Sequence, residues 1–311
     1  MADLNGIAYQ RGRFLPVEEV NVSILDPAFS KSDVVFDVVS VWDGRFFRLE
    51  DHLRRFRESR EYVRMKSPYS EDKMKQILAQ CVDRAGLSEA MVYMLCTRGS
   101  YTGGGAIGDP RSCENEFIAY SHPYYWVVPR ERVKTGAHLW LAETCRAPNS
   151  AINQKTKSFN RMDLTRAQFE ALDAGADAPV LPSTDGFLTE GPGFNLWIVK
   201  DGRVLTPGDN MLEGITRLTV FELCSLLDLE ATTANLTAED LQKSEEAFIS
   251  TTGGGIVPVT RVSERAIGDG TPGQISCTLR DLYWAKRAED WHTTSVSGLL
   301  ASSAESLAGT R

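Results

Sequence analysis

The order of predicted strands and helices indicates an α+β fold and not a regularly alternating α/β sheet. Val38–Trp42 and Arg45–Arg48 flank Asp43-Gly44, a two-residue turn typical of an antiparallel hairpin. Helices and strands follow in mixed order, without the strict strand–helix–strand repeat of a parallel sheet. With 311 residues, 42% of them hydrophobic, the chain can form one large or two smaller domains.

Helical periodicity marks residues 50–65 and 70–85, where apolar side chains recur at helical spacing among charged ones. Residues 90–96 and 116–120 have the apolar runs of buried strands. The glycine-rich stretch 99–109 lies between them, and we expect a mobile loop there.

The second half of the chain repeats this mixture. We predict strands at 137–143 and 247–252, and helices at 163–174, 216–226, 239–243 and 277–291. Pro123 and Pro129 mark a connector between the halves. Residues 294–311 are small, polar and weakly periodic, which favours a flexible tail. The predicted division is an N-terminal domain at 1–121, a connector at 122–131, a larger domain at 132–293 and the tail at 294–311.

Charge and composition exclude several classes of function. The net charge is −8 with no evident basic face, which argues against nucleic-acid binding. No run of 18 apolar residues suggests a membrane span, and the first residues lack the apolar region of a signal peptide. Six scattered cysteines and four histidines favour reduced thiols in a cytoplasmic protein, with no metal site.

Residues 188–217 are the most informative segment. They read LTEGPGFNLWIVKDGRVLTPGDNMLEGITR: an acid at Glu190, a strand pair around Asp201-Gly202, and a helix that begins near Thr216. Backbone amides at a helix start attract anions, and a lone carboxylate can pair with a protonated ring nitrogen. The segment is therefore a plausible cradle for a phosphorylated aromatic cofactor.

Reactive groups elsewhere are less specific. Lys157 could form a Schiff base with an aldehyde, and Lys155 is an equally good candidate on local grounds. Thr251 to Gly255 form either a phosphate nest or a tight strand exit. Arg55 and His52 lie on a charged helix, where a solvated arginine and a capping or core histidine are the ordinary interpretations.

Together these stretches resemble the fold-type IV pyridoxal-phosphate enzymes, namely branched-chain and D-amino-acid aminotransferases and (R)-selective amine transaminases. The likeness spans about Gly6 to Trp284 and is strongest to the amine transaminases. It is carried by SVWDGRFFRLEDHLRR, the Lys157 segment with its trailing MDL, LTEGPGFN, VKDGRVLTP, LEGITR and STTGGGIVP. The resemblance implies a small N-terminal α/β domain and a larger C-terminal pseudo-barrel domain.

The resemblance also implies a role for each matching position. Lys157 matches the lysine that forms a Schiff base with pyridoxal 5'-phosphate (PLP), whereas Lys155 falls out of register. Glu190 matches the acid on the pyridine nitrogen, and Leu212 the leucine against the ring face. The other cofactor-binding positions are Arg55, Ile215, Thr216, Thr251 and Thr252 at the phosphate, together with Asn195.

The substrate pocket departs from this pattern. A loop arginine that receives a carboxylate in the amine transaminases is absent here, where the matching position is near Gly104. A carboxylate would then pair with Arg161, whose ordinary interpretation is a surface salt bridge, or with Arg111 from the loop. The predicted pocket is rather apolar and is lined by Phe36, Val38, Met91, Tyr93, Phe159, Arg161 and Gly253.

The predicted function is PLP-dependent transamination between a primary amine or D-configured amino acid and a keto acid, ketone or aldehyde. Two alternatives are a same-fold lyase of the aminodeoxychorismate type and a non-catalytic PLP-binding protein. The resemblance further implies a homodimer with shared active sites.

Overall fold

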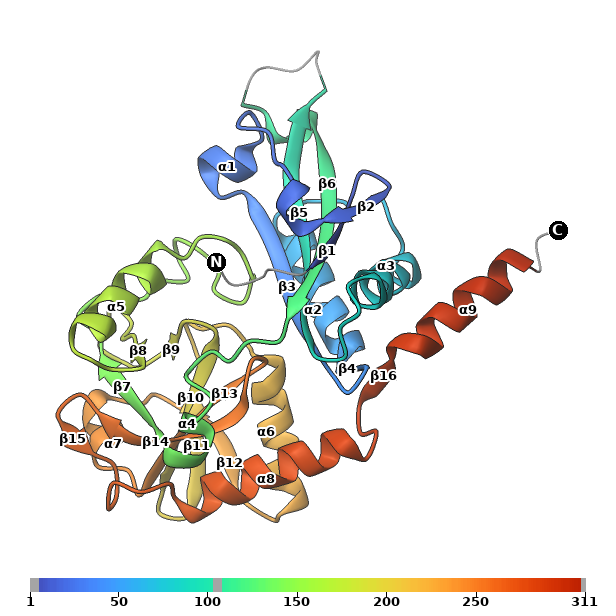
Figure 1. The fold of residues 1–311 in the computed structure, drawn as a ribbon. Helices are drawn as coiled ribbons and strands as arrows, with labels where there is room; N and C mark the ends of the chain where they lie inside the picture. Colours follow the sequence, from blue (N-terminus) through green and yellow to red (C-terminus); the bar gives the residue numbers. More distant parts are fainter. Residues whose placement is uncertain (1–5, 103–107, 309–311) are drawn as a thin grey trace. The chain divides into compact units, whose positions relative to one another are not determined.

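The computed structural model describes residues 6–102 and 108–308 and divides into two compact units (Figure 1). Unit 1 comprises the described residues up to Tyr125, the short segment Thr156–Asn160, and the chain from His292 onward. Unit 2 comprises Trp126–Lys155 and Arg161–Trp291. The chain thus leaves unit 1 within the connector expected at 122–131.

Unit 1 is built on a sheet whose described strands have the order β16-β4-β3-β5-β6-β1-β2. Its strands are β1 (Ile7–Gln10), β2 (Arg13–Pro16), β3 (Val34–Trp42), β4 (Arg45–Phe47), β5 (Ala90–Tyr101), β6 (Cys113–Pro123) and β16 (Thr293–Ser295). Its helices are η1 (Val17–Glu19), α1 (Pro27–Lys31), α2 (Leu49–Tyr62), α3 (Glu71–Arg84), η2 (Pro110–Ser112) and α9 (Val296–Ala308).

The predicted hairpin joins β3 to β4. Asp43 and Gly44 have φ angles of 49° and 67°, the left-handed values that a two-residue hairpin turn requires. Trp42 then pairs with Arg45. Because β4 is short, it covers only the last residues of β3, and the edge of β3 near Val34–Phe36 is left for another segment.

The sheet of unit 1 has two apolar faces because side chains alternate along each strand. Val35, Val39 and Val41 belong to the core that includes residues of α2 and α3. Phe36 and Val38 belong to a second apolar cluster on the other face. Asp37, which shares the face of Val35 and Val39, is therefore a carboxylate placed among helices, and it is fully buried.

The C-terminal segment differs from the predicted flexible tail at 294–311. Thr293–Ser295 pairs with β4 as strand β16, and α9 follows. Val296 is buried in the core of unit 1, with Leu299 and Leu300 packed against it. Three apolar residues at helical spacing thus anchor a segment whose overall composition is small and polar.

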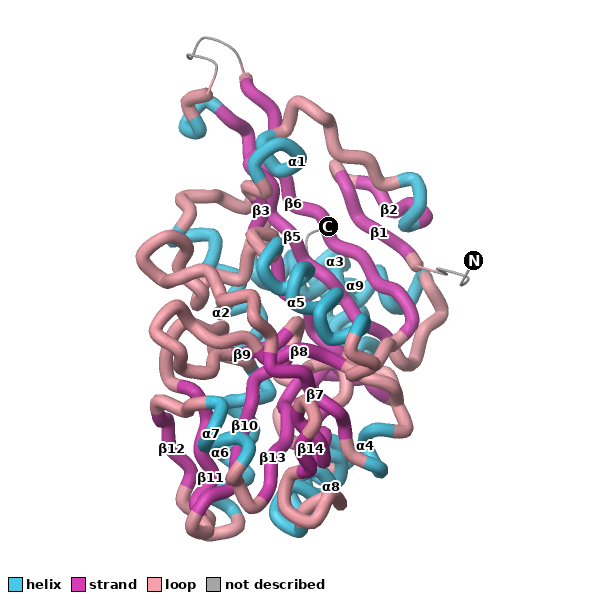
Figure 2. Tube along the Cα trace, turned by 90° about the vertical axis from the view of Figure 1, so that its left-hand side faces the viewer, coloured by secondary structure: helices cyan, strands magenta, loops and turns pink. Residues whose placement is uncertain are grey.

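Unit 2 contains a larger, mixed sheet with the described order β12-β11-β10-β13-β14-β7-β8, to which β9 and β15 add at β10 and β14. Figure 2 shows β10, β13 and β14 side by side. The strands are β7 (Ala137–Leu141), β8 (Ala178–Val180), β9 (Glu190–Gly191), β10 (Phe194–Lys200), β11 (Arg203–Pro207), β12 (Ala231–Ala234), β13 (Glu246–Thr251), β14 (Gly255–Val262) and β15 (Arg265–Ala266).

The helices of unit 2 are α4 (Arg132–Thr135), α5 (Met162–Asp173), α6 (Ile215–Leu226), α7 (Ala238–Gln242) and α8 (Gln274–Ala288). Helix α6 packs on β13 and α8, while α5 packs on β7 and β8. Within the sheet, Trp197 of β10 is fully buried and stacks on Phe248 of β13 at a centroid distance of 5.6 Å. The strands that carry Glu190, Asn195 and Thr251 therefore belong to one rigidly packed sheet.

Candidate active site

Lys157 lies in a segment that joins unit 1 as an extra edge of β3. The backbone N–H of Phe36 donates to the Lys157 carbonyl at 2.9 Å, and Ser158 forms an antiparallel bridge with Val35. The Lys157 N–H donates to Ser59 Oγ of α2 at 3.1 Å. Backbone contacts on both sides therefore fix the lysine, and this explains why residues 156–160 belong to unit 1 although we expected them in the 132–293 domain.

The two candidate lysines have different surroundings. The Nζ of Lys157 lies 4.7 Å from the centroid of the Phe36 ring. The Nζ of Lys155 forms an exposed ion pair with Glu213 at 2.9 Å, and this pairing raises the pKa of Lys155. A raised pKa makes an amine a poorer nucleophile at neutral pH, so the local chemistry favours Lys157.

Glu190 is buried and held from two directions in unit 2. Its Oε1 accepts from Arg146 Nε at 3.0 Å, and its Oε2 accepts from the Leu212 N–H at 3.1 Å. Glu190 also faces Asn195 across the β9–β10 pairing. The Asn195 Nδ2 donates to the Leu212 carbonyl at 2.8 Å, so both predicted residues are tied to the backbone of Leu212.

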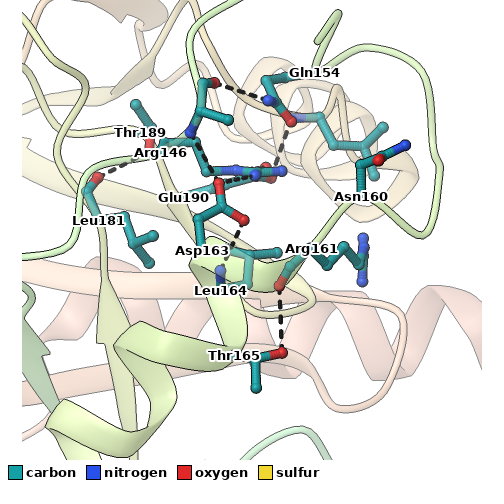
Figure 3. Close-up of polar contacts among 12 residues, drawn as sticks. Arg146, Gln154, Asn160, Arg161, Asp163, Leu164, Thr165, Leu181, Thr189 and Glu190 are labelled. Atoms are coloured by element: carbon teal, nitrogen blue, oxygen red, sulfur yellow. Dashed lines mark hydrogen bonds and ion pairs between the residues drawn. The ribbon is translucent and has the colours of Figure 1, made fainter. Parts of the chain in front are cut away.

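The sequence did not point to Arg146, which bridges Glu190 to Asp163 (Figure 3). Its Nη1 lies 2.5 Å from Asp163 Oδ2, and Arg146 is only 3% exposed. Burial alone raises the pKa of Asp163, but the Ala147 amide and the Arg146 charge outweigh it and lower that pKa. Glu190, Arg146 and Asp163 thus form a fixed row of alternating charges.

The start of α6 provides backbone donors. Gly214 is the N-cap, and among the described residues no side chain caps the first amides, which belong to Ile215 and Thr216. A Cβ at Gly214 would lie 2.1 Å from Asn195 Oδ1, so the close approach requires glycine. Open amides and the positive end of the helix dipole favour an anion here.

The strand exit at Thr251 is less simple. The Thr251 hydroxyl donates to the Gly193 carbonyl at 2.8 Å and accepts from the Gly253 N–H. The only hydroxyl proton of Thr251 is therefore used in the bond to Gly193, so other donors of this turn would have to bind a phosphate. Thr252 is half-buried beside it.

Four of the predicted pocket residues form one face of the unit 1 sheet. Phe36, Val38, Met91 and Tyr93 share an apolar cluster, and Phe159 packs edge-on against Phe36 at 4.9 Å. From Val34 to Val38 and from Met91 to Leu95, the side chains on this face are apolar or aromatic. Arg161 and Gly253 are in unit 2.

The two candidate carboxylate partners differ in their contacts. The Arg111 side chain is 85% exposed, and its Nε and Nη2 donate to the Asp109 carboxylate at 2.9 and 2.7 Å. Arg161 is the N-cap of α5, and its carbonyl accepts from Thr165. Gly104 lies outside the described residues.

Arg55 is buried against Asp37, which accepts from its Nε and Nη2 at 2.8 Å each. By their chemistry, groups of each unit suit a part of PLP: the Lys157 amine of unit 1 suits its aldehyde, whereas the buried Glu190 and the open α6 amides of unit 2 suit its pyridine nitrogen and its phosphate. Among residues 6–102 and 108–308, no three His, Cys, Asp or Glu side chains are grouped so as to hold a metal. Within the same ranges, no helix is long and apolar enough to cross a membrane.

Known proteins share both the sequence pattern and the fold. The family model for amino-transferase class IV matches residues 34–262. A putative branched-chain-amino-acid aminotransferase of Methanocaldococcus jannaschii is 29% identical over 280 residues, or 88% of this chain and 94% of that protein. A D-alanine aminotransferase of Bacillus licheniformis is 27% identical and covers 85% of this chain and 91% of that protein.

Among solved structures, the T.th. branched-chain amino acid aminotransferase with pyridoxamine 5'-phosphate superposes with a TM-score of 0.86 at 28% identity. The match covers 94% of this chain and 98% of that chain. Fold and comparisons define a PLP-dependent aminotransferase of fold type IV, which confirms the predicted α+β fold, cofactor and enzyme class. The chain belongs to the class IV aminotransferase family.

Proposed function

We propose that this aminotransferase takes amino groups from apolar or aromatic primary amines and D-configured amino acids, and gives them to a keto acid, ketone or aldehyde. The carrying observation is the apolar and aromatic cluster that contains Phe36, Val38 and Met91, whose Phe36 ring centroid lies 4.7 Å from Lys157 Nζ. A charged donor group has no partner among the strand residues of this face between Val34 and Val38 or between Met91 and Leu95.

The proposal assigns each residue a specific task. Bound PLP supplies an aldehyde for the donor's amino group and a ring that takes up the electron pair of the Cα–H bond. The Lys157 amine would bind the aldehyde of the cofactor and would accept the proton from Cα of the donor. Glu190 would pair with the ring nitrogen, and Arg146 holds the Glu190 carboxylate in place.

The relatives set the range of possible donors. Those named above are a putative branched-chain enzyme and a D-alanine enzyme, so the family includes an enzyme for a D-amino acid. We favour D-amino acids and (R)-amines because the stretches that carry the likeness, including SVWDGRFF and LEGITR, resemble those of the (R)-selective amine transaminases.

A half-reaction screen with the purified holoenzyme tests the proposal. Bleaching of the bound-cofactor absorbance is followed with (R)- and (S)-1-phenylethylamine, D- and L-leucine, and D- and L-alanine. We expect the (R)-amine and the D-amino acids to react fastest. A reaction confined to L-leucine and L-alanine would overturn the proposed substrate class, and pyruvate release without an acceptor would indicate a lyase.

The proposal includes a homodimer. Ile24, Leu25 and Phe29 lie close together in sequence and are 72%, 77% and 71% exposed. A monomer seldom exposes three neighbouring large apolar side chains, and a second copy of the chain would cover them. Light scattering should give twice the chain mass, and Leu25→Ser with Phe29→Ser should shift it toward the monomer. A monomeric wild type would contradict the proposal.

A further inference from the structure

Asp37 is an unusually well satisfied buried carboxylate. Its Oδ1 accepts from His52 Nδ1 at 2.7 Å, from Arg55 Nη2 at 2.8 Å and from the Val38 N–H at 2.7 Å. Its Oδ2 accepts from Arg55 Nε at 2.8 Å. Asp37 is 0% exposed, so a network of four donors compensates the loss of its hydration.

The donors come from one stripe of α2. His52, Arg55 and Ser59 follow one another at spacings of three and four residues, which places them on the same side of the helix. All three are buried, at 2%, 8% and 2% exposure. His52 and Arg55 bind Asp37, while Ser59 Oγ accepts from the Lys157 N–H.

The same strand that carries Asp37 also holds the lysine. Phe36, its neighbour in β3, donates its backbone N–H to the Lys157 carbonyl, and the Lys157 Nζ lies over the Phe36 ring. Arg55 and Lys157 are thereby fixed to adjacent residues of one strand. A rigid strand holds such a pair at a more constant separation than two loops would.

The charges of this network balance only when His52 is neutral. Burial lowers the pKa of His52, and the positive charges of Arg55 and Lys157 act in the same direction against the opposing effect of Asp37. Burial by itself raises the pKa of Asp37, but Arg55 and His52 outweigh it and hold that pKa well below its ordinary value. One negative carboxylate therefore faces one positive guanidinium.

A guanidinium can hold two anions at once, because its five N–H groups point outward along more than one edge of a plane. Asp37 takes the Nε–Nη2 edge of Arg55, whereas guanidinium groups also bind phosphate through their other N–H groups in a fixed planar geometry. An arginine on an isolated surface helix would have to lose side-chain freedom on binding, and a carboxylate clamp removes that cost beforehand.

We propose that Asp37 is a positioning residue. It holds the guanidinium of Arg55 in the orientation that receives the phosphate of PLP, and His52 holds Asp37 in place through its hydrogen bond. The inference rests on the proposed function and on the phosphate contact that the family resemblance implies for Arg55. The inference goes beyond that contact because it makes Asp37, which does not touch the phosphate, responsible for selectivity for the phosphorylated cofactor.

The experiment compares PLP with pyridoxal, which lacks the phosphate. Full-length protein freed of cofactor is titrated with each compound, and binding is followed by absorbance and by quenching of tryptophan fluorescence. Asp37→Asn, Arg55→Gln and the double variant are measured beside wild type. Asp33→Asn is a matched control from the same unit. Asp33 accepts hydrogen bonds from the Nε and Nη2 of Arg98 at 2.7 and 3.0 Å, as Asp37 does from the same atoms of Arg55.

We expect Asp37→Asn to weaken PLP binding by about 10-fold or more, the scale of one misaligned charge-assisted bond, and pyridoxal binding by less than about threefold. The double variant should be no weaker than Arg55→Gln, because the two residues act as one unit. Asp33→Asn should leave the ratio of PLP to pyridoxal affinity unchanged.

The outcomes separate the possible failures. If Arg55→Gln leaves that ratio unchanged, the phosphate contact itself is wrong. If Arg55→Gln lowers the ratio and Asp37→Asn does not, only the positioning role is wrong. Equal losses for PLP and pyridoxal would indicate a purely structural ion pair. Should Asp37→Asn not fold, Asp37→Glu replaces it, since it keeps the charge and moves the carboxylate by one methylene.

Discussion

The Nε of Arg146 lies 3.0 Å from the Oε1 of Glu190, and both side chains are almost fully buried. The guanidinium offsets the hydration that the buried carboxylate has lost, because the two groups form a hydrogen-bonded ion pair. Arg146 also pairs with Asp163, so the positive charge of Arg146 is compensated by carboxylates. Glu190 is thus fixed in place by a buried ion pair, as its proposed contact with a ring nitrogen requires.

Arg146→Met should be strongly destabilising. It removes one partner of a buried ion pair and leaves Glu190 without a countercharge, which costs about 3–5 kcal/mol. Chemical denaturation monitored by circular dichroism measures this change. Adding Glu190→Gln to Arg146→Met should restore part of the lost stability, because one of the two carboxylates that lost Arg146 is then neutral and only Asp163 remains. A double variant less stable than Arg146→Met alone would contradict this account.

Glu190→Gln should retain the cofactor and lose activity. The neutral amide can still fill the site and accept from the Leu212 N–H, but it does not hold the proton on the ring nitrogen. We expect the rate of the half-reaction to fall by about 10²-fold or more, the scale of removing a preorganised electrostatic partner. Stopped-flow absorbance measures it, and a rate near that of wild type would remove Glu190 from the mechanism.

The two lysines provide a matched comparison. Lys157→Ala should abolish transamination and the absorbance of the covalently bound cofactor while the fold persists, because the loss is chemical. Lys155→Ala should keep most activity, since it removes only an exposed ion pair with Glu213. Absorbance spectra and circular dichroism of both variants decide the assignment. Loss of the band in Lys155→Ala alone would show that the register is wrong.

Features that depend on local sequence were predictable, and those that depend on distant pairing were not. The Asp43-Gly44 turn needs two residues of positive φ, and such dipeptides are recognisable in the sequence. Arg146 pairs with Glu190 across 44 residues, and arginines are rarely buried, so nothing local marks it. Likewise, the three apolar residues that anchor α9 are hard to distinguish within a segment of small polar ones.

Acid should destabilise the protein partly through His52. The folded-state pKa of His52 lies below its ordinary value of 6.5, so the unfolded state binds this proton first as the pH falls. Stability is therefore full above pH 6.5 and decreases below it, by up to about 1.4 kcal/mol per pH unit for one proton. The depressed pKa of Asp37 acts in the same direction at lower pH.

The comparison is between wild type and His52→Gln, each unfolded in urea from pH 7.5 to 5. We expect the wild-type curve to fall more steeply below pH 6.5, because glutamine has no proton to take up. Glutamine can still donate to Asp37, which limits other changes. Parallel curves for the two proteins would show that His52 contributes nothing to the acid sensitivity.

The last prediction concerns the carboxylate of a keto-acid acceptor. If Arg161 pairs with it, Arg161→Ala should raise the apparent KM for pyruvate by about 10- to 150-fold, the scale of a charge-assisted hydrogen bond. The KM for a neutral aldehyde should barely change, because no charge is lost there. Steady-state kinetics with both acceptors gives the ratio.

Arg111→Ala is the competing variant. Arg111 already grips Asp109 with two bonds on the surface, so recruiting it to a substrate would break that pair. An exposed ion pair contributes little to stability, so the free-energy cost of this exchange is small and the variant is a fair test. If neither substitution separates pyruvate from the aldehyde, neither arginine holds the carboxylate. Neutral acceptors would then fit the apolar face beside Lys157 best.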